Sequence, residues 1–447
     1  MSDIFVAPPL ATRNGSMILG KNSDREPNEA QEIVRIPAKV HQASLAHTTF
    51  TTVPQVANTY EMILCKPFHV WGAEMGVNEH QLTVANTQVY TKVSISKNRQ
   101  ELTGPDLVRL ALERCKRSFD ALELLIALIE AHGQDAFDGY TRKGEYHHNS
   151  FVMADPEEAY LLETAGREWV ATKLWDFYTI SNALSIETEY DYSSKHLISY
   201  AKKQGWYNAG SAFNFKKVYT DKIQTYTSRS FERSRLAKEI TQGQQKDFDI
   251  QKGMAFLRSL SESAEIFEPR LHGKRSISMY ASGWDAPRQT NGSMIVELHA
   301  QKVPKIWVTG TSSPDISIFK PFFFPGRSIM EGEWPSPAEK ADDSLWWTHE
   351  RLHRMTQRYY GHFYEMLAEE RDQLQQAVLE HVHAISPSKM DANELDQLGY
   401  YFINQHRHAI KNWIEKVKGM ESPQRKSFRP VYQFYWNKQN KFAEVFS

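Results

Sequence analysis

The chain begins Met1-Ser2, and a serine at the second position can do chemistry if the methionine is removed. An aminopeptidase that removed Met1 would leave the Ser2 hydroxyl beside a free α-amine. An α-amine has a pKa of about 7.7–8.0, so much of it is unprotonated at neutral pH. Ser2 would then carry both a nucleophile and its general base. The alternative interpretation is an ordinary, disordered N-terminal serine, so the surrounding sequence must decide.

The amino-acid composition argues against several classes of function. The chain has 447 residues, of which 41% are hydrophobic and 24% charged, as in a globular protein with a sizeable core. Its 53 Lys and Arg balance 54 Asp and Glu, which gives no general case for nucleic-acid binding. No apolar run approaches the ~18 residues of a membrane helix, and the start does not resemble a signal peptide. We expect a cytoplasmic protein with no nucleic-acid partner and no membrane span.

The cysteines and histidines do not form a recognisable site. Cys65 and Cys115 are the only cysteines, which excludes a disulfide framework and fits a reducing cytosol. Neither has a CxxC partner, so we interpret both as core thiols. Tyr146-His147-His148 has no carboxylate or cysteine at ligand spacing to complete a metal site. We therefore expect no metal and no cofactor.

Hydrophobic patterning predicts the elements that would position a site. Two short strands, Asp3–Pro8 and Ser16–Gly20, flank the tight-turn pair Asn14-Gly15. An apolar stripe predicts a helix over Pro105–Cys115, and Ser118–His132 is a second helix. Further strands are predicted at Tyr60–Cys65, Gln81–Tyr90, Phe151–Ala154, Tyr160–Thr164, Trp169–Leu174, Ser276–Tyr280, Ser293–His299 and Lys305–Gly310. Clustered strands and clustered helices favour a layered α+β fold over alternating βαβ units.

The last quarter of the chain is predicted to be helical. The longest candidate is Leu345–Val382, and a final helix lies near Glu394–Val417. The Pro-rich stretch Trp334–Pro337 is the candidate boundary before it. The tail Arg425–Lys441 mixes basic and aromatic residues, a composition that can bind nucleic acid. Because the whole chain is neutral, we interpret it as a helix or strand edge that packs on the body.

Eight sequence motifs occur in one order across roughly residues 2–325. They are Phe5–Ala7, Gly20–Arg25, Glu29–Val34, Trp71–His80, Asp106–Arg114, Leu162–Arg167, Ile180–Ile186 and Ser317–Phe322. In these motifs the chain resembles the secernins and the related dipeptidases. That group is a branch of the N-terminal nucleophile (Ntn) hydrolases, which also contain bile-salt and penicillin V acylases. A set of eight colinear motifs is far more specific than any one of them.

The resemblance implies a four-layer α-β-β-α sandwich, in which two antiparallel sheets pack face to face between outer helices. It implies an Ntn-hydrolase domain over residues 2–333, followed by a helical region, 338–447, packed on the same body. The implied activity is hydrolysis of an amide bond, with a dipeptide or small amide as substrate. Ser2 would lie at the mouth of a cleft between the layers.

The resemblance also assigns roles near the chain start. Ser2 stands where the family usually has a cysteine nucleophile. Lys21 and Asp24 match positions that flank the nucleophile, where acylases commonly carry Arg and Asp. A cation near the α-amine would disfavour its protonation, and Asp24 would orient it. The alternative for Lys21 and Asp24 is a solvated loop at a strand end.

Three later residues receive roles from the same resemblance. Asn78 and Asn182 match asparagines that line the oxyanion hole, although Asn is also favoured in turns. Arg229 matches a late active-site arginine, with Arg233 nearly as good a candidate. Such an arginine could hold a substrate carboxylate by two parallel hydrogen bonds. The alternative is a charged helix face.

Two alternatives to a dipeptidase remain open. One is an acylase that acts on N-acyl amines by the same mechanism. The other is a catalytically silent, secernin-like protein that acts by binding in secretion or membrane traffic, an idea motivated by Ser2 in place of cysteine. The sequence leaves the oligomeric state open, a homo-oligomer included.

Overall fold

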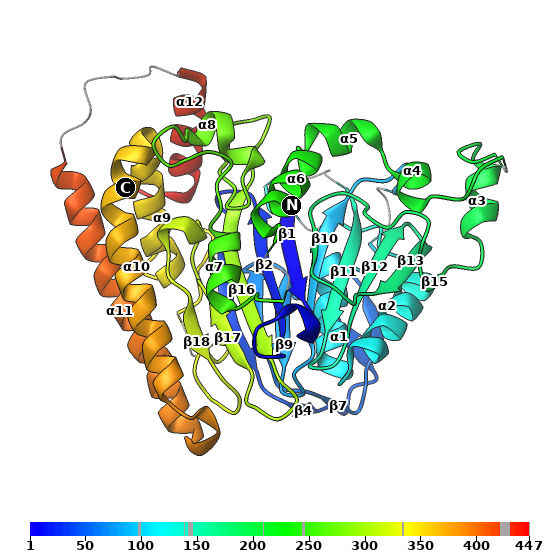
Figure 1. Ribbon diagram of the computed structural model, residues 1–447, viewed down its shortest axis with the longest axis horizontal. Coiled ribbons are helices and arrows are strands. Elements are labelled where there is room, and N and C mark those ends of the chain that lie inside the picture. The colour runs from blue at the N-terminus through cyan, green and yellow to red at the C-terminus, as the bar shows by residue number, and fades with distance from the viewer. Residues whose placement is uncertain are drawn as a thin grey trace.

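The structure is a computed structural model of the chain. It describes residues 1–96, 100–137, 139–141, 146–208, 210–243, 246–332, 335–420 and 430–446. Two large antiparallel sheets stand face to face at its centre, with helices on both outer sides (Figure 1).

The six-stranded sheet contains both strands of the β1–β2 hairpin. Its strands, in spatial order, are β14 (Tyr178–Ile180), β1 (Ser2–Ala7), β2 (Met17–Arg25), β16 (Gln289–Leu298), β17 (Lys305–Val308) and β18 (Lys320–Phe322). The predicted Asn14-Gly15 turn joins β1 to β2: Gly15 has a φ of 71°, which glycine adopts without steric cost. The hairpin register pairs Ser2 with Ser23, so the start of β1 lies beside the end of β2.

The eight-stranded sheet is the second β layer. Its strands, in spatial order, are β15 (Tyr192–Ser193), β13 (Glu168–Lys173), β12 (Ala159–Ala165), β11 (His148–Ala154), β10 (Thr83–Val89), β9 (Met75–Asn78), β8 (Met62–Pro67) and β3 (Gln31–Ile36). Two small sheets pair β4 (Lys39–Val40) with β7 (Asn58–Thr59) and β5 (Leu45–His47) with β6 (Thr52–Pro54).

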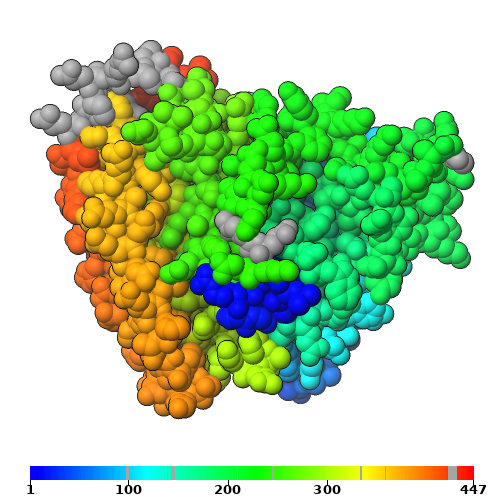
Figure 2. Space-filling model, in the orientation of Figure 1, coloured from blue at the N-terminus to red at the C-terminus, as the bar shows by residue number. Residues whose placement is uncertain are grey.

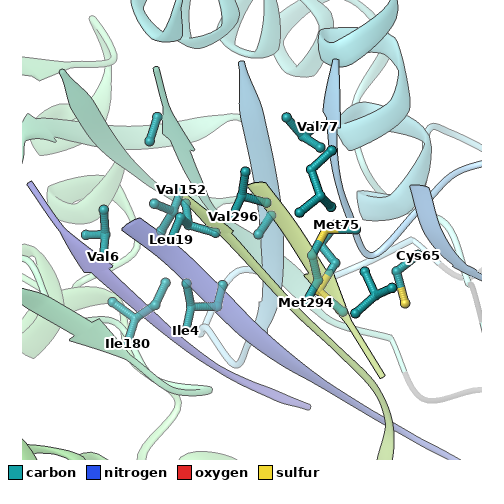
Figure 3. Close-up of a cluster of buried hydrophobic side chains, with 14 of the residues drawn as sticks. Ile4, Val6, Leu19, Cys65, Met75, Val77, Val152, Ile180, Met294 and Val296 are labelled. Atoms are coloured by element: carbon teal, nitrogen blue, oxygen red, sulfur yellow. The ribbon is translucent and has the colours of Figure 1, made fainter. Parts of the chain in front are cut away.

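The core between the sheets follows from strand alternation. Successive side chains of a strand point to opposite faces, so Ile4 and Val6 of β1 point inward while Phe5 packs in the outer core. The inner residues of the two sheets meet in a single apolar cluster, drawn in Figure 3 with Leu19 and Val296 on one side and Val77 on the other. By the same alternation, Ser2 belongs to the inward-facing set.

Helices close both outer faces. Against the eight-stranded sheet lie α1 (Gly104–Arg114) and α2 (Ser118–His132). Against the six-stranded sheet lie α6 (Ser230–Thr241), α7 (Ile250–Leu257), α10 (Tyr360–Ala384) and α11 (Ala392–Gly419). The order helix, sheet, sheet, helix confirms the predicted four-layer α+β sandwich (Figure 1).

The short helices lie mostly in the segments of chain that connect the main helices and strands of these layers. They are α3 (Leu197–Lys203), α4 (Phe215–Tyr219), α5 (Lys222–Thr227) and α8 (Pro269–His272), with 3-10 turns at Pro9–Ala11, Gly273–Arg275, Pro314–Ile316, Gln357–Tyr359 and Pro387–Lys389.

The C-terminal helices pack on the edge of the six-stranded sheet and form one flank of the face in Figure 2. They are α9 (Leu345–Thr356), α10, α11 and α12 (Pro430–Ala443). The predicted helix Leu345–Val382 is divided by the 3-10 turn at Gln357–Tyr359. Residues 333, 334 and 425–429 lie outside the described residues, so the boundary at 333/338 stays a prediction.

One predicted strand is wrong. The segment Ser276–Tyr280 is buried but has no strand structure, because its backbone forms no ladder with a neighbouring strand. It meets β16 only at Met279, whose carbonyl accepts the N–H of Thr290 and whose own N–H donates to the Thr290 side chain. Its other groups bond to loops: the N–H of Ser278 donates to the carbonyl of Ser259, and the Ser278 and Tyr280 hydroxyls donate to Asp315. Of the strands in the two large sheets, β3, β9, β14, β15 and β18 were not predicted.

Candidate active site

Ser2 is the first residue of β1 and is 1% exposed. Its backbone N–H donates to Oδ1 of Asn182 at 3.0 Å, and its carbonyl accepts from the Thr87 hydroxyl at 3.4 Å. Its own hydroxyl donates to the carbonyl of Met1. Every polar group of Ser2 is thus held in place, and its hydroxyl already lies against a peptide carbonyl.

Asp24 lies beside Ser2 because of the β1–β2 hairpin. Its backbone N–H donates to the Met1 carbonyl at 2.8 Å, and its backbone carbonyl accepts from the Met1 α-amine at 2.7 Å. Its carboxylate accepts from the Thr290 hydroxyl at 2.6 Å through Oδ1, whereas buried Oδ2 has no hydrogen-bond partner among the described residues. The Asp24 backbone thus holds the amine of Met1, while the expected contact between Asp24 and the Ser2 amine stays a prediction for the chain without Met1.

Two carboxylates share this buried region. Burial, followed by the nearby charge of Asp3, raises the pKa of Asp24 to about 6 against the opposing effects of the terminal amine and Arg233. Burial likewise raises the pKa of Asp3, against the opposing charge of Arg233. Asp24 therefore changes its charge within the pH range in which enzymes operate.

Asn182 follows β14 and is completely buried. Its Oδ1 accepts from Ser2 N–H and from Nη2 of Arg233 at 2.6 Å. Its Nδ2 donates to the Thr87 hydroxyl at 3.0 Å and to the Gln88 carbonyl at 2.8 Å. In this arrangement the amide oxygen faces Ser2, and both amide hydrogens face β10. Asn182 is placed to orient the Ser2 nitrogen, while the oxyanion role stays a prediction.

The arginine beside the site is Arg233. It lies on α6 with no exposed side-chain surface, and its Nε donates to the buried carboxylate of Asp3 at 3.1 Å. Arg229 directly precedes α6 and has a left-handed conformation with a φ of 58°. Its side chain therefore takes a different direction from that of Arg233. Its guanidinium pairs with Glu232 at 2.6 Å and lies over the ring of Tyr226. Of the two candidate arginines, the structure thus brings Arg233 to Asn182 and Asp3 beside Ser2 and pairs Arg229 with Glu232, while the substrate-binding role of either residue stays a prediction.

Lys21 lies in the inward-facing set of β2 and is completely buried. Its Nζ donates to the side chain and the carbonyl of Glu74, each at 2.8 Å, and to Asn86 Oδ1 at 3.2 Å. Burial lowers the pKa of Lys21, and Glu74 partly offsets this. In the hairpin Lys21 pairs with Ile4, two residues beyond Ser2. Its contacts thus join the two sheets below the site, without a hydrogen bond to Ser2.

Asn78 is not brought to Ser2. Its Nδ2 donates to the carbonyls of Leu112 and Cys115 at the end of α1, at 2.9 and 2.8 Å. Its Oδ1 accepts the backbone N–H of Leu82 at 3.1 Å within a turn. These contacts lie on the helix-covered face of the eight-stranded sheet, opposite the face that meets the other sheet. The structure supports the turn interpretation of Asn78 and gives it no contact with the nucleophile.

Sequence reasoning missed three residues beside the terminus. Asp3 pairs with Arg233 behind Ser2. The sequence could have indicated Asp3, because it is a charged residue next to Ser2 on an otherwise apolar strand. Gln88 accepts from the Met1 amine at 3.4 Å, and Nη1 of Arg288 donates to the same Gln88 oxygen at 2.7 Å. No local pattern indicated Gln88 or Arg288, because the fold brings them together from distant segments.

A cavity of about 560 Å³ opens at this point. Met1 lines it, together with the end of β10, residues around α5 and the segment that precedes β16. Met1 is buried, and burial lowers the pKa of its α-amine well below the usual range, with the charge of Arg288 as the next cause. Residue 1 is thus the group that separates Ser2 from the cavity.

Comparison with known proteins places the chain in a family. The model of peptidase family C69 matches residues 9–238, which is just over half of the chain. The chain belongs to peptidase family C69. A curated relative, a "Probable dipeptidase" of Salmonella dublin, is 26% identical over 242 residues, which are 50% of this chain and 54% of the relative. The match therefore spans about half the length of that relative.

Solved structures with some likeness include three amide hydrolases. A mutant of the conjugated bile acid hydrolase from Clostridium perfringens has a TM-score of 0.39 at 11% identity and covers 68% of this C69 chain and 88% of its own. Penicillin V acylase from Agrobacterium tumefaciens has a TM-score of 0.41 at 10% identity, covering 74% and 88%. An N-acylethanolamine-hydrolyzing acid amidase orthologue from Caenorhabditis elegans has a TM-score of 0.33 at 12% identity. The match covers 66% of this chain and 91% of the amidase. The family assignment rests on the sequence match.

Two further properties bear on partners. No described helix of this C69 protein is long and apolar enough to cross a membrane. Within the described ranges, no group of three or more His, Cys, Asp or Glu side chains is arranged to hold a metal ion. Cys65 and Cys115 are buried free thiols, as predicted.

Proposed function

We propose that this C69 protein is an amide hydrolase of the dipeptidase type that uses Ser2 as its N-terminal nucleophile. The observation that carries the proposal is the surroundings of Ser2: a fixed hydroxyl, a nitrogen bonded to Asn182, and a 560 Å³ cavity beyond residue 1. The likeness to a "Probable dipeptidase" supports a dipeptide as substrate. The cytoplasmic location predicted from the sequence belongs to the same proposal.

The mechanism begins with removal of Met1. The Ser2 nitrogen then becomes a primary amine that already contacts Asn182 Oδ1. Burial and, next, the charge of Arg288 lower the pKa of the Met1 amine at this end of the chain, and we expect the same surroundings to favour the neutral form of the Ser2 amine, which is the form that can accept a proton.

The chemistry then takes two steps. The Ser2 oxygen attacks the scissile carbonyl carbon, and its proton passes to the α-amine. The C–N bond breaks, the ammonium returns its proton to the leaving amine, and an ester to Ser2 remains. Water, deprotonated by the same amine, attacks the ester carbon, which releases the acid and restores the Ser2 hydroxyl.

The proposal is tested with protein whose intact mass shows loss of Met1 alone. Dipeptides and N-acyl amino acids are offered to the wild type, Ser2→Ala and Ser2→Cys, with thermal unfolding as the folding control. We expect dipeptide hydrolysis by the wild type, none by Ser2→Ala, and activity that iodoacetamide abolishes in Ser2→Cys. Full activity of a folded Ser2→Ala protein would exclude this mechanism. Preference for N-acyl amino acids would instead favour the acylase.

A retained Met1 or an acetylated Ser2 would favour the binding protein considered above, because neither leaves a free α-amine on Ser2 to serve as its base.

A further inference from the structure

The first residue of the chain extends the β1–β2 hairpin by one pair. The register between the two strands ends with Ser2 opposite Ser23. Beyond that pair, the amine of Met1 donates to the carbonyl of Asp24 at 2.7 Å, and the N–H of Asp24 donates to the carbonyl of Met1 at 2.8 Å. Two residues that exchange both bonds form a hydrogen-bonded pair of an antiparallel ladder. Residue 1 is therefore held mainly through its backbone atoms.

The amine of Met1 has a second acceptor on the opposite sheet. This acceptor is Oε1 of Gln88, on β10, at 3.4 Å. Burial, followed by the charge of Arg288, lowers the pKa of the amine well below its usual range, which favours the neutral form. A neutral primary amine has two N–H donors, and Asp24 and Gln88 provide one acceptor for each. An acylated nitrogen would have a single N–H and would add an acyl group at a buried position.

Met1 occupies the position that the acyl group of an acyl-enzyme would take. In the proposed mechanism the acyl group is an ester on the Ser2 oxygen, whereas in the unprocessed chain Met1 is an amide on the Ser2 nitrogen. Only Cα and Cβ separate these two atoms of Ser2, and the Ser2 hydroxyl donates to the Met1 carbonyl. Because Met1 lines the 560 Å³ cavity, its removal would join this space to the cavity.

We propose that the space occupied by Met1 is the subsite for the amino-terminal residue of the substrate, with the Asp24 carbonyl and Gln88 as the acceptors of its α-amine. This inference rests on the proposed function. The N–H of Asp24 would bind the carbonyl that Ser2 attacks, so cleavage follows the first residue of a peptide. The side chain of that residue would extend towards Arg233, whose Nη2 lies 3.9 Å from the Met1 sulfur. An N-acyl amine offers these acceptors no free amine.

The test uses processed protein, from which Met1 has been lost, and two substrates that differ in one group. One is methionyl-alanine, and the other is the same molecule with hydrogen in place of the α-amine. We expect wild-type kcat/KM to favour methionyl-alanine by about 10-fold or more, as expected for two hydrogen bonds. Gln88→Met removes one acceptor at similar side-chain length and should reduce this preference by about 3- to 10-fold. Gln224→Met, the same change elsewhere in the cavity lining, should keep the wild-type preference.

Two results would overturn the inference. One is a wild type that hydrolyses the analogue without the amine as well as it hydrolyses methionyl-alanine. The other is a Gln88→Met protein that keeps the full preference. Either result would leave Ser2-dependent hydrolysis untouched, because it concerns only how the substrate amine is recognised.

A binding measurement distinguishes failure of the proposed function. In processed Ser2→Ala protein, calorimetry should show tighter binding of methionyl-alanine than of the analogue, and Gln88→Met in that background should reduce the difference. The same Ser2→Ala chain with Met1 retained should bind neither compound, because its own first residue fills the subsite. If no variant hydrolyses peptides but these binding results hold, the catalytic proposal fails and the amine subsite stands. Equal binding of the two compounds, or their binding to the chain that retains Met1, would exclude the subsite.

Discussion

Ser2 and Arg233 donate hydrogen bonds to the same atom, Oδ1 of Asn182, at 3.0 and 2.6 Å. The asparagine thus fixes the nitrogen that would serve as general base and links it to a buried guanidinium. The two amide hydrogens of Asn182 are held by β10, which prevents the side chain from turning over. The orientation of the Ser2 nitrogen therefore depends on a single carboxamide.

Asn182→Ala should abolish most catalysis while the fold persists. Loss of the acceptor leaves the Ser2 amine unoriented and Arg233 without one of its bonds, so we expect kcat to fall by about 100-fold or more, as when an active-site amide is removed. Dipeptide hydrolysis per folded molecule measures this. Asn78→Ala is the matched control: it leaves two carbonyls at the end of α1 without a donor, which costs about 1–3 kcal/mol of stability. Equal kcat losses in both variants would contradict the assignment.

Arg233 and Arg229 offer a second matched pair. Arg233→Ala leaves the Asp3 carboxylate buried without its ion partner, and breaking such a pair costs about 3–5 kcal/mol. It should also reduce kcat, because Asn182 loses its second donor. Arg229→Ala removes a partly exposed pair with Glu232 and should change stability by less than about 1 kcal/mol. Denaturant unfolding and dipeptide hydrolysis test both. A stable, active Arg233→Ala protein would show that Arg233 has no part in the site.

The difference between these two arginines shows what the sequence could predict. Motif matching placed an arginine near Tyr226–Arg233, but only the left-handed conformation at Arg229 determines which one turns inward. Ser2, Asp24 and Asn182 were assigned from the family resemblance, and the structure brings all three together at the start of β1. A motif match does not show which face of a strand Asn78 occupies, because successive side chains point to opposite faces: Val77 points into the inner core, and Asn78 bonds to the end of α1. Gln88 and Arg288 depend on two sheets meeting, and no local pattern encodes that contact.

The raised pKa of Asp24, about 6, predicts how stability depends on pH. Between about pH 4 and 6 the folded chain holds a proton at Asp24 that the unfolded chain has lost, so the free energy of unfolding should fall as pH rises. The shift from 3.8 corresponds to about 3 kcal/mol in total. Asp24→Asn should flatten this part of the profile, as measured by urea unfolding from pH 4 to 7.

Asp247 provides a control for that profile, because its pKa is shifted in the opposite direction to that of Asp24. Hydrogen bonds from Arg13 and Lys252 lower the pKa of its exposed carboxyl. Its stabilising contribution is therefore present at neutral pH and is lost as pH falls. Asp247→Asn should change the slope in the opposite direction to Asp24→Asn, mainly below about pH 4 because the carboxyl of the unfolded chain has a pKa near 3.8, so the profile is extended to about pH 2 for this variant. An unchanged profile in Asp24→Asn would show that Asp24 has an ordinary pKa in the folded protein.

The burial of Met1 predicts that removal of this residue precedes folding. Met1 is 7% exposed, and its amine donates to the carbonyl of Asp24 at 2.7 Å, so an aminopeptidase has no access to the terminus of the folded chain. Protein that retains Met1 should resist a methionine aminopeptidase in its native state, whereas the same protein should lose one methionine in urea at the lowest concentration that unfolds it. Intact mass measures both, and a peptide with the first ten residues is the control for enzyme activity in each buffer.

After refolding, only the processed chain should hydrolyse dipeptides, because an amide nitrogen at Ser2 cannot accept the hydroxyl proton. Processing of the native protein at the rate of the peptide would show that Met1 is accessible in solution.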